Sequence, residues 1–377
     1  MGSRDQRNLR HVALFIGQLG LGGTETQVSL LARELQQRGI KVDVLVVSKG
    51  GPHEKKLRDA GIRIHHVGSR RKWPRRASAI RKLWTFVRLV RTLRRLRPDV
   101  LHAFLLEAYF PGTPAALLAG VPVMVAGRRS MTDVLRTGPR RRSFALASRM
   151  VRITDHVVAN AVAVADDVRR VERIPPHKLS VIYNGMADAA FEPVERATID
   201  TDHQVVLCLA RLRPEKGHSV LIEAAGLLAR QGTPCTFVLV GDGPEEERLK
   251  AQARTSNADI RFFGAMTDAR GMLDRADVVV LPSISEGLSN AVMEAMARGR
   301  PIIATAVGGT PELLEDRGVL VPPSDPVSLS QAIARLLRDP ETAASLGAAA
   351  RAWATKNLRA ATMAEEHIAL YGRLLER

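Results

Sequence analysis

LPSISEGLSNAVMEAMARGRPIIATAVGGTPELL, residues 281–314, contains the clearest pattern in the chain. The apolar run Val278–Leu281 leads into it, and a second apolar run, Pro301–Ala304, follows a glycine-containing loop and a helical segment. This order predicts a strand, a loop, a helix and a second strand. In a parallel α/β sheet, such a loop lies at the carboxyl end of the first strand, where ligands bind.

Two acidic residues lie in this stretch, Glu286 in the loop and Glu294 in the helix. The helix is predicted to begin near Ser289 or Asn290, which are both good N-caps. The main-chain amides from Gly287 to Asn290 are then free to hold a phosphate. Two carboxylates beside an anion site need neutral partners rich in hydroxyl groups, and the hydroxyls of a sugar meet that need.

A pair of cations follows another predicted strand. Arg211 and Lys216 occur in LARLRPEKG, directly after the apolar run Val205–Ala210. Pro214 and Gly217 keep this segment from forming a helix. An arginine fork and a lysine point charge suit a diphosphate, although a solvated basic loop would have the same composition.

Two glycine-rich turns also follow predicted strands. Gly241 and Gly243 flank Asp242 after the run Thr236–Val240, where glycine permits a close approach of the backbone. Near the N-terminus, the loop 17–25 contains Gly22 and Gly23 and joins a strand to a helix, which suggests a phosphate cradle. It does not match G-x-G-x-x-G, so a dinucleotide-dependent dehydrogenase is disfavoured.

Length and composition indicate a two-domain globular protein. The chain has 377 residues, 45% of them hydrophobic, and its two cysteines, Cys208 and Cys235, lie in apolar runs typical of a core in a reducing compartment. No secretory signal is evident. The most apolar long stretch, 103–127, is interrupted by a glutamate and three prolines, which favours a loop, a helix and a strand over a membrane span.

Charge is divided unevenly between two α/β series. Residues 1–185 contain 35 Lys and Arg against 13 Asp and Glu, a net charge of +22, whereas residues 186–377 contain 21 against 26, a net −5. Strands and helices alternate through 1–185 and again through 186–359. We therefore predict two domains, each a doubly wound parallel sheet covered by helices.

The segment Arg70–Arg97 is strongly basic. Its apolar residues, among them Ile80, Leu83, Trp84 and Val87, recur at helical spacing. A cationic face with such residues beside it indicates a helix on an anionic membrane surface. The alternative is a solvated face above ordinary core contacts. Aromatic residues are too sparse here to indicate a nucleic-acid partner.

The stretch 281–314 and its flanks resemble the E-x7-E signature of retaining nucleotide-sugar glycosyltransferases of family 4 (glycosyl transferases group 1), which have the GT-B fold. The resemblance covers most of the chain and is strongest over 205–314. It implies two Rossmann-like domains facing a cleft, with the nucleotide sugar bound by 186–359 and the acceptor by 1–185. In this fold the last helix, 360–377, returns to the N-terminal domain.

The resemblance also implies roles for individual residues. Arg211 and Lys216 match the pair that holds the donor diphosphate, Glu286 matches the residue that contacts the donor sugar, and Glu294 matches the one that binds the ribose. The remaining matches are to backbone positions near the nucleotide or its phosphates: Gly22, Gly23, Gly241, Gly243, Gly287, Leu288, Ser289 and Asn290. His102 matches the first histidine of D-V-V-H-x-H, but Phe104 replaces the second, which leaves open whether His102 is catalytic or structural.

The expected reaction is transfer of a sugar from a nucleotide-sugar donor to an acceptor hydroxyl, with retention of configuration, in cell-surface polysaccharide or glycolipid synthesis. The resemblance implies no metal and no cofactor beyond the donor. The acceptor is expected to be sugar- or lipid-linked, and the protein cytoplasmic, with peripheral attachment to the inner face of the membrane. The alternatives are a phosphorylase or epimerase with the same fold, and a non-catalytic, membrane-binding subunit.

Overall fold

The computed structural model describes residues 9–20, 22–68, 78–132 and 149–377. It divides into two compact units, one formed by Met1–Gly185 with Ala360–Arg377 and the other by Met186–Arg359. Among these described residues, each unit has one sheet, and all of its strand pairs are parallel. Parallel strands need helical crossovers, which is why the strand and helix patterns alternate along the sequence.

The first unit has a seven-stranded sheet with the order β3-β2-β1-β4-β5-β6-β7. Its strands are β1 His11–Ile16, β2 Lys41–Val46, β3 Arg63–His66, β4 Val100–Phe104, β5 Val123–Arg128, β6 His156–Ala159 and β7 Leu179–Val181. The inner strand β1 is buried along its whole length, as expected for a strand covered on both faces.

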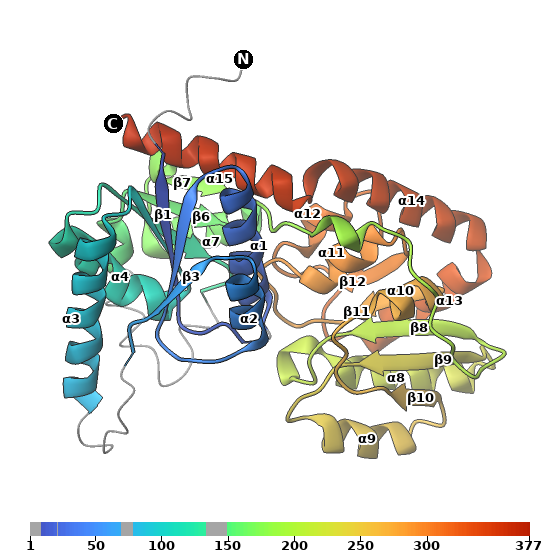
Figure 1. Cartoon of the computed structure of the whole chain (residues 1–377). Coiled ribbons are helices and arrows are strands. Elements are labelled where there is room, and N and C mark those ends of the chain that lie inside the picture. The colour runs from blue at the N-terminus through green and yellow to red at the C-terminus, as the bar shows by residue number, and fades with distance from the viewer. Residues whose placement is uncertain (1–8, 21, 69–77, 133–148) are drawn as a thin grey trace. The chain divides into compact units, whose positions relative to one another are not determined.

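Helices cover this sheet in two groups. They are α1 Gly23–Gln37, α2 Pro52–Asp59, α3 Ser78–Leu96, α4 Leu106–Ala119, α7 Val162–Glu172 and α15 Ala360–Leu375. Helix α1 packs against α2 and α15, while α3 packs against α4. The last helix of the chain therefore lies beside the first (Figure 1), and its Ile368 and Tyr371 belong to the core of this unit.

The second unit has a six-stranded sheet with the order β10-β9-β8-β11-β12-β13. Its strands are β8 Gln204–Leu209, β9 Cys235–Val240, β10 Asp259–Phe262, β11 Val278–Leu281, β12 Ile302–Thr305 and β13 Val319–Val321. Its helices are α8 His218–Arg230, α9 Glu246–Arg254, α10 Arg270–Arg275, α11 Asn290–Ala297, α12 Thr310–Leu314, α13 Pro326–Arg338 and α14 Pro340–Asn357. Both cysteines are free and buried in its core.

Helix α7 and the three-residue strand β7 follow β6 and complete the first sheet. The last part of the chain forms two helices, α14 and α15, which are separated by Leu358 and Arg359, so the last helix begins at Ala360, where the expected helix 360–377 begins. The carbonyl of Leu358 accepts a hydrogen bond from the amide of Met186 at 2.7 Å, and Arg359 forms a parallel β-bridge with Met186. The backbone between α14 and α15 therefore pairs with residue 186 and does not continue the helix.

Candidate active site

The second sheet reverses its direction of growth between β8 and β11. From β8 the chain adds β9 and β10 on one side, and then β11, β12 and β13 on the other. Open parallel sheets bind ligands at this kind of switch point, outside the carboxyl ends of the strands. The loops that leave β8 and β11 here are residues 210–217 and 282–289, and they contain half of the predicted donor-site residues, among them Arg211, Lys216 and Glu286.

These two loops contact each other through their backbones. The amide of Ile284 donates to the carbonyl of Glu215 at 2.8 Å. Gly217 has a φ of +68°, and a Cβ on it would lie 1.9 Å from the carbonyl oxygen of Pro282. Only glycine fits this position, because both the left-handed backbone and the close approach exclude a side chain.

Lys216 and Glu286, predicted separately on the two loops, form an ion pair. Lys216 Nζ lies 2.5 Å from Glu286 Oε1, and the hydroxyl of Ser283 donates to the same oxygen at 2.8 Å. The side chain of Lys216 is 25% exposed and that of Glu286 is 10% exposed. The pair thus fixes a positive and a negative group side by side at the switch point while leaving the cation accessible.

Arg211 lies on the same loop as Lys216 and extends toward solvent. Its Nε is 3.8 Å from Asp242 Oδ1, and both side chains are more than half exposed. Gly241 and Gly243, on either side of Asp242, press against this loop: a Cβ would lie 2.0 Å from the carbonyl oxygen of Ala210 at Gly241, and 2.2 Å from that of Leu212 at Gly243. The glycines thus allow the loop after β9 to support the Arg211 loop.

Helix α11 starts at the predicted place. Ser289 is its N-cap, and the Ser289 hydroxyl accepts the amide of Val292. Leu288 is buried, and the carbonyl of Gly287 accepts the amide of Gly309 at 2.7 Å, so the loop after β12 supports this turn. A capped helix start of this kind presents main-chain N–H groups and the positive end of the helix dipole to an anion.

Glu294 lies within α11 and has a perturbed carboxyl group. Burial, with a smaller contribution from the charge of Asp268, raises the pKa of Glu294 to about 7. The carboxyl group is therefore only partly ionised near neutral pH, and a partner with hydroxyl groups would stabilise its ionised form.

The remaining predicted site residues lie in the first unit, whereas Lys216 and Glu286 lie in the second. Gly22 precedes α1 and Gly23 is its first residue. A Cβ on Gly22 would lie 2.2 Å from Glu25 Oε2, which is the end of a flexible side chain that could move aside. Leu21, between this turn and β1, is outside the described residues.

His102 lies inside β4, two residues before the strand ends at Phe104. The ring of His102 is completely buried, its Nδ1 is 2.6 Å from the hydroxyl oxygen of Tyr371, and it stacks on Phe104 at a centroid distance of 4.0 Å. Burial, then the charges of neighbouring groups, holds the pKa of His102 well below its usual range. These contacts give His102 a structural role, and its catalytic role stays a prediction.

Sequence reasoning missed several residues that shape this site. Ser283 holds Glu286, and its position three residues earlier in the same loop was the available signal. Asp268 raises the pKa of Glu294 from a distant loop, which no local pattern indicates. His218 follows Gly217 and is buried, and burial together with the charge of Lys216 lowers the pKa of His218 to about 4.

The basic segment Arg70–Arg97 is described from residue 78 onward, and its part at 70–77 lies outside the described residues. In α3, Leu89 and Leu93 are fully buried, whereas Ile80 and Leu83 are 58% and 63% exposed. The first half of this helix therefore keeps apolar side chains at the surface. Within the described ranges, no helix combines the length and apolar character needed to cross a bilayer.

Comparison with solved structures identifies the fold. Anabaena Alr3699/HepE, solved in complex with UDP, matches with a TM-score of 0.81 and 20% identity, over 97% of this chain and all of that one. Sucrose-phosphate synthase from Thermosynechococcus elongatus matches with a TM-score of 0.79 and 21% identity, over 97% of this chain and 99% of that one. Two doubly wound parallel sheets of this kind define the GT-B fold.

Sequence comparisons identify the family. The model described as "Glycosyl transferases group 1" matches residues 192–353, and "Glycosyltransferase Family 4" matches residues 21–189. D-inositol 3-phosphate glycosyltransferase from Acidothermus cellulolyticus is 30% identical, over 88% of this chain and 82% of the relative. Alpha-D-kanosaminyltransferase from Streptomyces kanamyceticus is 29% identical, over 67% of this chain and 72% of the relative. The chain belongs to the glycosyl transferases group 1 family, family 4 of the glycosyltransferases, and is an enzyme of that class.

Proposed function

We propose that the protein transfers a sugar from a nucleotide-sugar donor to an acceptor hydroxyl, with retention of configuration, and that the donor binds at the switch point of the second sheet. The observation that carries this proposal is the contact of Lys216 with Glu286 at 2.5 Å, because it joins a cation suited to phosphate and a carboxylate suited to sugar hydroxyls. The solved relative in complex with UDP supports a nucleotide as the donor's leaving part.

The diphosphate binds Arg211, Lys216 and the start of α11. Arg211 is more than half exposed and can place its fork on two phosphate oxygens. The main-chain amides at Leu288, Ser289 and Asn290 add neutral donors at a helix N-terminus. Together these groups stabilise the charge that builds on the leaving diphosphate, and they take the place of a metal ion. Such electrostatic stabilisation is usually what lowers the barrier most in reactions with a charged leaving group.

The two carboxylates grip hydroxyl groups. Glu294 accepts hydrogen bonds from the ribose hydroxyls, and their contact favours the ionised form of a group whose pKa is about 7 in the free protein. Glu286, fixed by Ser283, contacts the donor sugar ring. The positive charge of Lys216 lies beside the carboxylate and offsets its repulsion of the diphosphate.

In the reaction, the bond between the anomeric carbon and the diphosphate oxygen breaks, and a bond from the same carbon to the acceptor oxygen forms. The proton of the acceptor hydroxyl passes to the departing phosphate oxygen, which lies on the same face of the sugar. A nucleoside diphosphate leaves. This route needs no carboxylate nucleophile and gives a product with the anomeric configuration of the donor.

The first unit binds the acceptor, which we expect to be sugar- or lipid-linked. The exposed Ile80, Leu83 and Trp84 on a helix with six Lys or Arg and no Asp or Glu support contact with an anionic membrane, at the inner face of the cell membrane. A role in cell-surface polysaccharide or glycolipid synthesis accords with this surface.

A transfer assay with a radiolabelled donor tests the proposal. The purified protein is incubated with each common nucleotide sugar and membrane lipid extract, and the anomeric configuration of the product is read by NMR. Incorporation of label with the donor's configuration is expected. Sugar phosphate formed from inorganic phosphate would identify a phosphorylase, an altered nucleotide sugar would identify an epimerase, and an inverted product would refute the retaining mechanism.

A further inference from the structure

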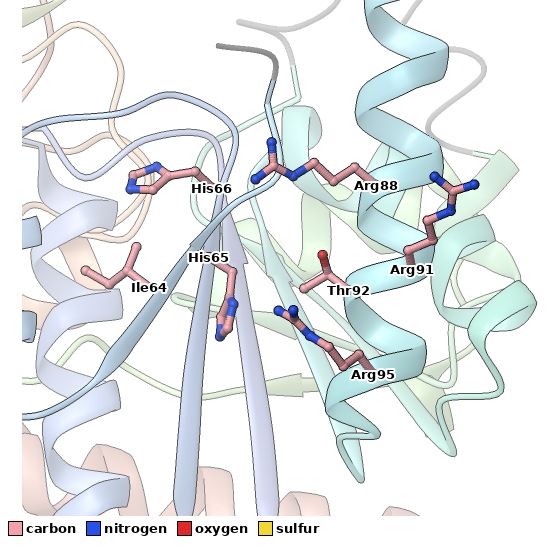
Figure 2. A pocket seen from close by; sticks show the side chains of 7 residues that line it. All are labelled: Ile64, His65, His66, Arg88, Arg91, Thr92 and Arg95. Atoms are coloured by element: carbon pink, nitrogen blue, oxygen red, sulfur yellow. The ribbon is translucent and has the colours of Figure 1, made fainter.

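A cavity opens at the edge of the first sheet, between β3 and α3. Its volume is about 420 Å³, which is within the range of small-molecule sites. Strand β3 is the end strand of the sheet, and α3 is the helix that leads from it toward β4. Figure 2 shows side chains from β3 on one side of this cavity and from α3 on the other.

The helical wall is cationic. Arg88, Arg91 and Arg95 occur at a spacing of three and four residues, so they share one face of α3 and all line the cavity. Residues 78–96 contain no Asp or Glu. Across the described ranges, no ion pair reaches any of these three guanidinium groups, whereas Arg58 and Arg63 nearby are both paired. The cavity therefore holds unneutralised positive charge.

The strand wall does not supply the missing negative charge. His65 and His66 line it, and their Nε2 atoms contact Asp43 at 2.7 Å and Glu54 at 3.0 Å. The negative charge of each carboxylate is already neutralised by an arginine. Arg63 lies 3.1 Å from Asp43, and Arg58 lies 2.9 Å from Glu54. Although burial opposes it, hydrogen bonds from two histidines lower the pKa of Asp43, so this carboxylate stays ionised and engaged.

Part of the cationic wall is held in place. Arg88 is partly buried, lies over the ring of Trp84 at 5.2 Å, and has its Nη1 3.5 Å from the carbonyl oxygen of Gly68. Thr92, which is buried, adds a hydroxyl group between Arg88 and Arg95. A guanidinium restrained by stacking loses less freedom when it binds an anion.

We propose that this cavity binds a phosphate group carried on a larger molecule. Guanidinium groups match phosphate oxygens in pairs, which favours phosphate over a single carboxylate. The row from Arg88 to Arg95 extends over about 10 Å at 1.5 Å per residue, longer than one phosphate, so the ligand has a polar body beyond it. The inference is independent of the donor site, which lies in the other unit.

The phosphate can come from a soluble phosphate ester or from a lipid headgroup. Exposed Ile80, Leu83 and Trp84 lie on the preceding turns of the same helix and would meet the acyl region if the source were a lipid. Both sources present the same group to the arginines, and the experiment separates them.

The test compares two double variants with equal charge change in the full-length protein. Arg91→Ala with Arg95→Ala removes two of the three arginines that line the cavity. Arg81→Ala with Lys82→Ala removes two exposed cations of the same helix that do not line it. All proteins also carry Arg211→Ala and Lys216→Ala, so that the donor site does not compete. Glycerol 1-phosphate is titrated by calorimetry, and vesicles containing phosphatidic acid are assayed by co-sedimentation.

We expect the cavity variant to lose about tenfold or more in affinity for at least one probe, and to lose clearly more than the control variant, which removes the same charge from another part of the helix. Binding of free glycerol 1-phosphate identifies a soluble ester, and binding of vesicles alone identifies a lipid headgroup. Equal losses in the two variants would show diffuse attraction and overturn the proposal, as would the absence of binding to both probes. The thermal unfolding temperatures of the cavity variant and the control variant should equal that of their shared parent protein, which shows that both are folded.

Discussion

His102 Nδ1 lies 2.6 Å from the hydroxyl oxygen of Tyr371, although the two residues are 269 positions apart. The contact joins β4, in the middle of the first sheet, to α15, the last helix of the chain. Both side chains are completely buried. It is one of the interactions by which the C-terminal helix becomes part of the N-terminal unit.

Replacing Tyr371 with Phe should destabilise the protein without reducing turnover. The change leaves a buried nitrogen of His102 without its partner, which costs about 1–3 kcal/mol of unfolding free energy. Urea unfolding followed by circular dichroism measures the loss, and initial rates are corrected for the folded fraction.

His102→Asn is the companion to that experiment. A structural His102 predicts a similar loss of stability and an unchanged rate per folded molecule. A fall in rate well beyond that of Tyr371→Phe would instead support the catalytic role predicted from the sequence.

The buried histidines of this region should make the protein sensitive to acid. Burial lowers the pKa of His367 to about 3, and burial also lowers the pKa of His102. In the unfolded chain, each histidine has a pKa of about 6.5. The unfolded chain therefore binds protons that the folded chain does not. Stability is complete above about pH 6.5 and falls below it, by about 1.4 kcal/mol per pH unit for each histidine.

His367→Met tests that slope. Unfolding free energies measured at intervals from neutral to mildly acidic pH should fall less steeply in the variant, by about 1.4 kcal/mol per pH unit. An unchanged slope would mean that His367 is protonated in the folded protein.

Lys216→Ala should reduce kcat/KM by about 10²–10³-fold, because it removes a cation from the leaving diphosphate. Arg213→Ala is the matched control: it is a cation three residues away on the same loop, with its guanidinium 3.9 Å from Glu215. We expect the control to change kcat/KM by about threefold or less. Steady-state rates of donor hydrolysis give both values, and similar effects of the two changes would contradict the assigned role of Lys216.

Nucleotide binding should strengthen as pH rises through neutrality. The pKa of Glu294 in the free protein is about 7, and the ribose hydroxyls bind its ionised form, so affinity for a nucleoside diphosphate should rise. The rise from about pH 6 to about pH 8 should be about tenfold.

Glu294→Gln isolates this effect. The variant should retain only the pH dependence that comes from the nucleotide's own phosphate, and it should lose the preference for a ribonucleotide over its 2′,3′-dideoxy analogue. Calorimetric titrations supply both comparisons. A wild-type protein that binds the two nucleotides equally would remove Glu294 from the ribose site.

Much of the local structure at the proposed donor site could be predicted because its signals are local. Ser289 as an N-cap, Gly217 beside a turn, and Glu286 with Glu294 at a fixed spacing are all readable within a few residues. Asp268 was missed because it acts on Glu294 through space from another loop. The contact of Asp242 with Arg211 likewise joins two loops that are distant in the sequence. The hydrogen bond from the Met186 amide to the Leu358 carbonyl also joins segments that are far apart in the sequence.

The order of apolar runs, glycine loops and helical segments is sufficient to specify parallel α/β units, because strand and helix periodicity and turn chemistry are properties of neighbouring residues. Which strand lies beside which is not local. The reversal of strand order between β8 and β11, which brings Lys216 to Glu286, and the burial of His102 against Tyr371 both depend on contacts between distant segments. Such contacts form only when the sheets assemble and exclude water, so their distances and shifted pKa values became visible only in the folded structure.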